Sequence, residues 1–194
     1  MDSDRGDSLV ELDRPTDEQL AAEAAREGSD GPAFTELVDR FKDRVWRICY
    51  RLLGNDHDAH DATQEVLVRM FLHRTRFEGR SRYSTWVHGL AVRTCLTLRR
   101  GRGRRLRREN VAGDETWNAQ SAEGNESPET KLDLLDMLDV LDEEDRALVI
   151  LKYAENYSHE ELGEMFGISE SACKMRIARA RDKIQQRYGA SQDN

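Results

Sequence analysis

The sequence predicts an all-α protein made of two small helical domains joined by a flexible acidic linker, with a helix-turn-helix in the C-terminal domain. Apolar residues recur with helical spacing through most of the chain. Charged residues make up 35% of the 194 residues and hydrophobic residues 38%, a composition that fits small helical modules better than one large core. An acidic stretch without any period separates the two helical parts.

Five segments follow from these patterns. We expect residues 1–15 to be a disordered acidic N-terminus, because they are rich in charge and poor in aromatic residues. Residues 16–108 form the expected N-terminal domain and 109–130 the linker, which is acidic and contains Gly, Ser, Asn and Pro. Residues 131–188 form the expected C-terminal domain, and 189–194 a tail.

The chain is expected to work in the cytoplasm without inserting into a membrane. No run approaches the ~20 apolar residues of a membrane span, and the N-terminus is acidic where a signal peptide would be basic and then apolar. Cys49, Cys95 and Cys173 are odd in number and lie far apart, so neither a disulfide framework nor a zinc site is indicated. We expect three buried thiols; a redox role stays open.

Helix signals follow one another along the N-terminal domain. Thr16 and Gln19 have capping-box spacing and predict a short helix that runs to Glu27 and stops at Gly28. A longer helix is predicted by an apolar stripe that ends before Gly54; the stripe consists of Phe34, Leu37, Val38, Phe41, Val45, Ile48 and Leu52. A further helix over residues 56–74 would bury Ala59, Ala62, Val66 and Met70.

The start of that further helix reads HDAHD, which admits two interpretations. His57 and His60 lie beside Asp58 and Asp61, and such pairs can bind metal in phosphohydrolases. Acids in the first turn of a helix are also explained by the helix dipole, and no other cluster of ligands accompanies them. We therefore expect no metal and no cofactor. The polar side with Asp61, Gln64 and Glu65 is either a docking surface or a solvated face.

Residues 74–108 hold twelve arginines and one acid, Glu78, in a chain of net charge −8. Like charges concentrated in this way destabilise a compact state, so a polyanionic partner is indicated. Phe77, Tyr83 and Trp86 lie among the arginines and either belong to the core or offer faces on which unpaired bases stack. Ser84 is a possible cap for a helix that buries Leu90 and Leu98, among others, before residues 101–108 continue as an extended basic arm.

The C-terminal domain contains four predicted helices. Leucines at 132, 135, 138 and 141 indicate an amphipathic helix, and Asp142 caps the next. Ser158 opens a full capping box with Glu161, Gly167 forms a tight turn, and Ser169 caps the last helix. Two short helices joined by a tight glycine turn are typical of a helix-turn-helix.

The last helix has the pattern of a DNA recognition helix. Cys173, Ile177, Ala180 and Ile184 fall on one side at 100° per residue, and form the expected packed face. The opposite side carries small and basic residues suited to the major groove, namely Ser171, Lys174, Met175, Ala178 and Arg179. Arg176 and Arg181 flank this side and would reach phosphates. A merely structural helical hairpin is the alternative.

With its predicted helices and basic segments in this order, the chain resembles the bacterial extracytoplasmic-function sigma factors, group 4 of the sigma-70 family. Four strings carry the resemblance, TDEQLAAEAAREG, DAHDATQEVLVRMF, FEGRSRYSTWVHGLAVRTCL and YSHEELGEMFGISESACKMRIARARDKI. The resemblance covers residues 16–188. It implies a protein without catalytic residues that binds core RNA polymerase and directs promoter-specific transcription initiation, as for a stress or envelope-signal regulon.

The resemblance also implies roles for residues. Asp61, Gln64 and Glu65 would dock on the polymerase clamp, and the C-terminal domain would lie near the flap. The single-stranded −10 element would contact Ser81, Arg82, Tyr83 and Trp86, with Arg93 and Arg99 on the DNA backbone. The duplex −35 element would contact Ser171, Lys174, Met175, Arg176, Ala178 and Arg179. An anti-sigma factor is a further expected partner.

The chain departs from the family pattern at three places. Ala172 and Cys173 replace a common Thr-Val pair, and Leu67 stands where a bulky aromatic is frequent. Arg80 and Arg82 make the −10 loop more basic than usual, so the preferred base does not transfer from relatives. Two other classes of function remain as alternatives, a metal-dependent phosphohydrolase built on HDAHD and an ordinary helix-turn-helix regulator with an N-terminal sensor.

Overall fold

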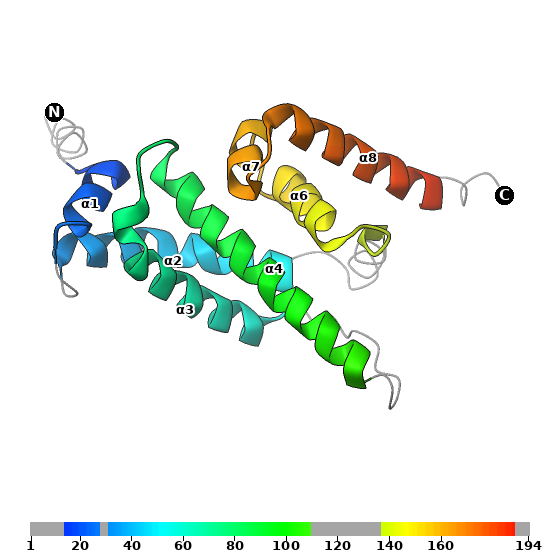
Figure 1. The fold of residues 1–194 in the computed structure, drawn as a ribbon, viewed down its shortest axis with the longest axis horizontal. Coiled ribbons are helices and arrows are strands. Elements are labelled where there is room, and N and C mark those ends of the chain that lie inside the picture. The colour runs from blue at the N-terminus through cyan, green and yellow to red at the C-terminus, as the bar shows by residue number, and fades with distance from the viewer. Residues whose placement is uncertain (1–13, 28–30, 110–136, 189–194) are drawn as a thin grey trace, which may run out of the picture.

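The computed structural model describes residues 14–27, 31–109 and 137–188, and their side chains except those of 103–109. Within these ranges the regular structure is helical, which confirms the predicted all-α class (Figure 1). The elements are α1 (Asp17–Ala24), α2 (Pro32–Leu53), α3 (Asp56–Leu72), a 3-10 turn η2 (Arg74–Arg76), α4 (Tyr83–Glu109), α6 (Glu143–Ala154), α7 (His159–Phe166) and α8 (Glu170–Tyr188). None of the helices described is both long and apolar enough to cross a bilayer. The expected disordered N-terminus, the expected linker and the tail lie wholly or almost wholly outside the described ranges.

We call α1 to α4 the N-terminal bundle. Its first helix begins as predicted, since the Thr16 hydroxyl accepts a hydrogen bond from the Gln19 N–H and the Gln19 side chain returns one to the Thr16 backbone. The helix ends at Ala24, and the prediction that it runs to Glu27 is wrong. Glu27 instead accepts a hydrogen bond from the N–H of Ala33 at 3.1 Å, so its carboxylate satisfies the start of α2.

The antiparallel pair α2 and α3 is joined by a tight turn. Gly54 ends α2 at a φ of 78°, and the Asn55 side chain caps α3. The predicted buried residues of both helices are confirmed, apart from Phe34 and Val38, which are half-buried. All three cysteines are buried free thiols, as predicted, and those of Cys49 and Cys95 hydrogen-bond across α2 and α4.

Two predictions for α4 are wrong. The helix begins at Tyr83, not after a Ser84 cap, because the Glu18 carboxylate of α1 accepts a hydrogen bond from the Tyr83 N–H at 3.0 Å. This bond lowers the pKa of Glu18. Leu98 is 41% exposed, although the helical pattern places it on the buried side.

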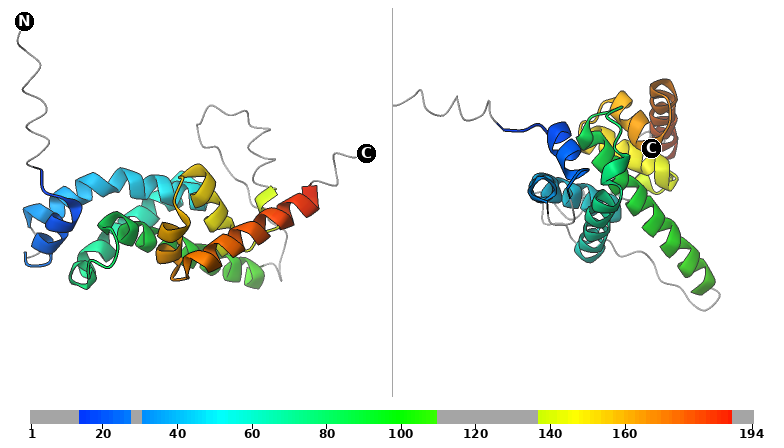
Figure 2. Two further views of the ribbon diagram at one scale, coloured as in Figure 1. Left: turned by 90° about the horizontal axis from the view of Figure 1, so that it is seen from above. Right: turned by 60° about the vertical axis from the view of Figure 1, so that its left-hand side comes forward.

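The predicted extended arm at residues 101–108 is also wrong, since α4 stays helical to Glu109 and its last turns project beyond the neighbouring helices (Figures 1 and 2). Arginine has a high helix propensity and the helix is already nucleated, so two glycines do not end it. Arg100 and Arg102 form ion pairs with Glu144 and Asp58, which offset part of the repulsion within the segment.

We call α6 to α8 the C-terminal bundle. Asp142, Ser158 and Ser169 each cap a helix through the side chain, as predicted. Gly167 ends α7 at a φ of 69°, and the Ile168 N–H donates to the carbonyl of Gly163 at 2.9 Å, which completes the helix-turn-helix. Of the helix predicted around leucines 132 to 141, the first half lies outside the described residues, and Leu138 and Leu141 are buried.

The two bundles share one continuous hydrophobic core, with α4 between them (Figure 1). α4 contacts α2 and α3 on one side and α6 and α7 on the other. The contact includes a buried polar pair, because the Tyr157 hydroxyl lies 2.8 Å from Nδ1 of His88. Burial, and secondly the charge of Arg44, lower the pKa of His88 to about 4, while Glu161 opposes this.

Replacing Gly163 with Ala should destabilise the helix-turn-helix. A Cβ at this position would lie 2.7 Å from the carbonyl oxygen of Ile168, so the backbone of the turn must shift. We expect a loss of ~1–3 kcal/mol in the free energy of unfolding measured by urea denaturation. Gly101→Ala is the matched control, because a Cβ there has no atom within 4 Å and improves helix propensity. Equal stability of the two variants would contradict this account of the turn.

The stability of the protein should fall as the pH drops from 6.5 to about 4, partly through His88. In the unfolded chain His88 takes up a proton near pH 6.5, whereas in the fold it stays neutral until about pH 4. The stability that neutral His88 contributes is therefore fully present above pH 6.5, and ~3 kcal/mol of it is lost as the pH falls to about 4.

The free energy of unfolding of His88→Gln, measured by urea denaturation at both ends of this pH window, should change less than that of the wild-type protein. The difference between the two changes should be ~3 kcal/mol. His57→Gln, at a side chain 84% exposed, is the control for simply removing a histidine. An unchanged pH dependence in His88→Gln would show that the buried pair is not responsible.

Candidate nucleic-acid interface

The outer side of α8 presents the predicted reading residues to solvent. Cys173, Ile177 and Ala180 are at most 3% exposed and hold the helix against α6 and α7. The opposite side is exposed and consists of Ser171, Lys174, Met175, Ala178 and Arg179. Met175 has 55% of its surface exposed, which is unusual for a large apolar side chain. The helix-turn-helix therefore exposes small, basic and apolar groups with the chemistry of major-groove recognition, and Lys174 among them pairs with Glu170 of the same helix at 2.6 Å.

Unlike the other residues predicted to contact the −35 element, Arg176 is bound to acidic side chains of its own bundle. Its guanidinium donates to Asp145 at 2.8 Å and to Glu144 at 3.0 Å, and 26% of its side chain is exposed. Both acids belong to the first turn of α6. In this arrangement Arg176 is held by carboxylates of the same bundle, while Arg179 and Arg181 remain exposed.

An aromatic cluster stands at the start of α4, behind the loop of residues 77–82. The ring of Tyr83 lies 5.0 Å from that of Phe77 and 5.5 Å from that of Trp86, between centroids. Tyr83 is 1% exposed and burial raises its pKa, whereas Trp86 is half-buried. Of the loop residues, Arg82 is exposed and Ser81 partly so. The structure thus brings the predicted −10 residues together but places the Tyr83 ring inside the core.

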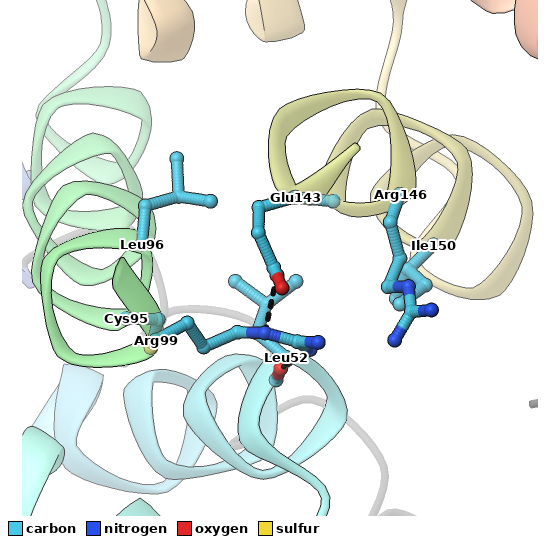
Figure 3. Close-up of a pocket in the computed structure, with 8 residues that line it drawn as sticks. Leu52, Cys95, Leu96, Arg99, Glu143, Arg146 and Ile150 are labelled. Atoms are coloured by element: carbon cyan, nitrogen blue, oxygen red, sulfur yellow. Dashed lines mark hydrogen bonds and ion pairs between the residues drawn. The ribbon is translucent and has the colours of Figure 1, made fainter. Parts of the chain in front are cut away.

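Arg93 and Arg99, predicted to follow the DNA backbone, face the C-terminal bundle. Arg93 donates to the carbonyl of Met165 in α7 at 3.1 Å. Arg99 donates to the carbonyl of Leu52 at 2.8 Å and pairs with Glu143 at the start of α6, in a small pocket between α2, α4 and α6 (Figure 3). Only 13% of its side chain is exposed. Burial lowers the pKa of both guanidinium groups.

The outer side of α3 carries the predicted docking residues in one exposed stripe. Asp61, Gln64 and Glu65 are exposed, and Glu65 pairs with Arg69 at 2.7 Å. Val68 and Leu72 continue the same stripe and are 52% and 62% exposed. The sequence reasoning missed these two residues, although their i+3 and i+4 spacing from Glu65 and Val68 would have found them. A mixed acidic and apolar stripe of this kind suits a protein partner.

The histidines near the start of α3 point outward and pair with acids on the same helix. His57 lies 3.4 Å from Asp61, and His60 lies 3.5 Å from Asp56. Among the residues that the structure describes, no group of three or more His, Cys, Asp or Glu side chains is arranged to hold a metal ion. The His–Asp contacts are therefore pairs within one helix.

Comparisons with known proteins agree with these features. A family model of sigma-70 region 2 matches residues 37–105, and one of sigma-70 region 4 matches residues 131–184. The chain is 31% identical over 167 residues to the ECF RNA polymerase sigma factor SigW of Bacillus subtilis, covering 80% of this chain and 88% of SigW. It is 34% identical over 160 residues to the ECF RNA polymerase sigma factor SigE of Mycolicibacterium smegmatis, covering 79% of this chain and 60% of SigE.

The fold also has a solved counterpart. The sigma factor RpoE of Bartonella quintana, in complex with the anti-sigma factor NepR, superposes with a TM-score of 0.62 at 21% identity, over 79% of this chain and 94% of RpoE. The match to sigma-70 region 2 falls on the bundle that carries the arginines and the aromatic cluster, and the match to region 4 contains the helix-turn-helix. The chain belongs to the extracytoplasmic-function sigma factors of the sigma-70 family, the promoter-specific initiation factors of RNA polymerase.

Proposed function

We propose that this sigma factor binds core RNA polymerase through the outer stripe of α3 and contacts its promoters with two separate surfaces. The surface at the start of α4 takes up the opened −10 element, and the outer side of α8 reads the −35 element as duplex. The exposed reading face of α8, set on a complete helix-turn-helix, is the observation that carries this assignment.

Recognition of the −35 element rests on side chains that reach base edges. Lys174 and Arg179 supply cationic donors for the acceptors of guanine, and Met175 and Ala178 supply apolar contacts for thymine methyl groups. Arg181 is exposed beside them and reaches phosphates, which position the helix without reading sequence. Arg176 joins the phosphate contacts only after it leaves Glu144 and Asp145.

Recognition of the −10 element combines charge and stacking. Trp86 is half-buried at the edge of the aromatic cluster and offers part of its ring to an unstacked base, while Ser81 and Arg82 lie on the adjoining loop. Because Tyr83 is buried, we assign it the role of holding Trp86 and Phe77 in place. Arg93 and Arg99 are assigned to the strand phosphates, which they reach only after they leave Met165 and Glu143 of the C-terminal bundle.

The stripe of Asp61, Gln64, Glu65, Val68 and Leu72 supports docking on the polymerase clamp, with the C-terminal bundle near the flap. Exposed apolar groups flanked by acids provide both buried area and charge selectivity in such an interface. An anti-sigma factor that covers this stripe would block docking, and we propose such a protein as a second partner.

Changing Lys174 or Arg179 to Ala should reduce discrimination between the cognate −35 sequence and its variants by ~1–3 kcal/mol for each base that the removed side chain reads. Arg181→Ala, on the same helix, should weaken binding to all sequences equally, because a phosphate contact carries no sequence information. Competition binding of polymerase holoenzyme to −35 variants measures both effects. If Lys174→Ala and Arg179→Ala also weaken all sequences equally, the reading face is wrongly assigned.

Core bacterial RNA polymerase with the protein should start transcription at a discrete set of sites in a pool of genomic promoter fragments. Run-off products, compared with those of core enzyme alone, measure this and reveal the shared −35 and −10 sequences. Absence of stimulation, together with absence of a stable complex with core enzyme, would contradict the proposal and favour an ordinary helix-turn-helix regulator.

A further inference from the structure

The recognition helix α8 is joined to α6 by a buried carboxylate. Asp145 lies in the first turn of α6, and only 7% of its surface is exposed. Its Oδ1 accepts a hydrogen bond from Nε of Arg176 at 2.8 Å and lies 2.7 Å from Nη2 of the same guanidinium. Its Oδ2 lies 3.7 Å from Nζ of Lys183, two turns further along α8. Both oxygens of one buried carboxylate therefore face cations of the recognition helix.

The guanidinium of Arg176 is directed toward α6 by all three of its nitrogens. Two of them meet Asp145, and the third, Nη1, donates to Oε2 of Glu144 at 3.0 Å. Nη2 also lies 3.8 Å from the carboxylate of Asp142, the residue that caps α6. A planar guanidinium has donors in fixed directions, so it satisfies several acceptors in one orientation only. These contacts therefore fix where the middle of α8 lies against the start of α6.

Apolar packing between the same two helices does not fix that position by itself. The contact includes Val149 of α6 and Ala180 and Ile184 of α8. Apolar contacts are non-directional and tolerate sliding of one helix on the other, whereas charge-assisted hydrogen bonds do not. The Asp145 N–H donates to the Asp142 carboxylate at 2.8 Å, so the residue that carries the buried carboxylate is itself held in the helix cap.

Arg176 stands in the middle of the proposed reading face. The exposed residues Lys174 and Met175 precede it, and the exposed residues Ala178 and Arg179 follow it. A shift of α8 by one residue along its axis would move each of these side chains by ~1.5 Å. Contacts to base edges require side chains placed to within about 0.5 Å. The link to α6 therefore lies where it controls the register of the reading face.

The same link argues against a phosphate contact by Arg176. If Arg176 turned outward, the buried Asp145 carboxylate would keep only Lys183, at 3.7 Å, as a cationic partner from α8. Removing one partner of a buried ion pair is strongly destabilising, because the charge that remains has lost its hydration. Arg181, which is exposed on the same helix, has no such cost to meet before it contacts a phosphate.

We propose that Arg176 and Asp145 are positioning residues of the −35 reading face, and that their pair stays closed while DNA is bound. Arg176 then acts through the placement of Lys174 and Arg179 and neutralises no phosphate itself. The inference rests on the proposed function, because it concerns the same face of α8. It decides between the two roles open to Arg176, a phosphate contact and an internal link.

Replacing Arg176 with Lys separates these two roles. Lysine keeps the charge that a phosphate contact needs, but a single ammonium cannot reproduce the fork that joins Asp145 and Glu144. In competition binding of polymerase holoenzyme, Arg176→Lys should lower discrimination between the cognate −35 sequence and its single-base variants about tenfold. Arg187→Lys, the same change at an exposed position near the end of α8, is the control. Discrimination equal to that of the wild-type protein would overturn the proposal.

Asp145→Asn tests whether Arg176 acts through Asp145. This variant should lose about as much discrimination as Arg176→Lys, and the double variant should be no worse than either single variant, because each change breaks the same link. Asp182→Asn removes one negative charge from an exposed position of α8 and is the control. Additive losses, or full discrimination in Asp145→Asn, would overturn the proposal.

The salt dependence of holoenzyme binding reports phosphate contacts directly. Each contact contributes ~0.9 to the slope of log K against the logarithm of the salt concentration. Arg181→Gln should reduce the magnitude of this slope by about that amount, whereas Arg176→Gln should keep the wild-type slope. Equal reductions would overturn the proposal. If circular dichroism shows that Arg176→Gln has lost helix, Arg176→Lys decides the question, since it retains the charge beside Asp145.

The outcomes distinguish this inference from the proposed function. If wild-type holoenzyme discriminates among −35 sequences and Arg176→Lys discriminates equally well, only the positioning role is wrong. If wild-type holoenzyme does not discriminate among −35 sequences, the reading face itself is wrongly assigned, and the positioning role falls with it.

Discussion

α4 is buried on two opposite sides, and the arrangement of both bundles depends on that burial. Val87, Ala91 and Cys95 are fully buried in the shared core, whereas Leu96 and Arg99 line the pocket against α6. A helix held in this way has little freedom to tilt, because interiors are close-packed. The aromatic cluster at its N-terminus therefore lies on a rigid support, which also fixes Arg93 and Arg99 against the C-terminal bundle.

Charge pairing explains how an acidic chain can carry two strongly basic segments. The net charge is −8, yet the arginines of α4 gather where acids of α6 and α3 can meet them. Pairing of this kind lowers the self-repulsion of the basic segments in the free protein. It also reduces the positive potential that would otherwise attract nucleic acid of any sequence, so binding depends more on the specific contacts.

The buried polar groups between the bundles contribute more to fixing one packing arrangement than to the free energy of that packing. Glu155 with its two arginines and His88 with Tyr157 lose hydration on closure, and the ion pairs offset that cost only while both partners are in place. A purely apolar contact of the same area would hold the bundles together more tightly. The observed contact holds the two bundles in one register.

Local signals in the amino-acid sequence were enough to predict most of the helices and which side of α8 is packed. The signals are the capping boxes at Thr16 and Ser158, the turn at Gly167 and the packed side of α8, each of which depends on residues close together in the chain. The exposed side of α8 follows from its packed side. The exposed stripe from Glu65 to Val68 and Leu72 also follows from local helical spacing, but Val68 and Leu72 were not predicted.

How the two bundles pack against each other could be learned only from the tertiary structure. The stripe of α4 that faces the C-terminal bundle consists of Gly89, Arg93, Leu96 and Arg100, which has helical spacing but no apolar pattern. Glu18, which accepts a hydrogen bond from the start of α4, is distant in sequence and in no way distinguished from other surface acids. Contacts between residues far apart in the chain leave no periodic signal, because each depends on packing that exists only after the fold has formed.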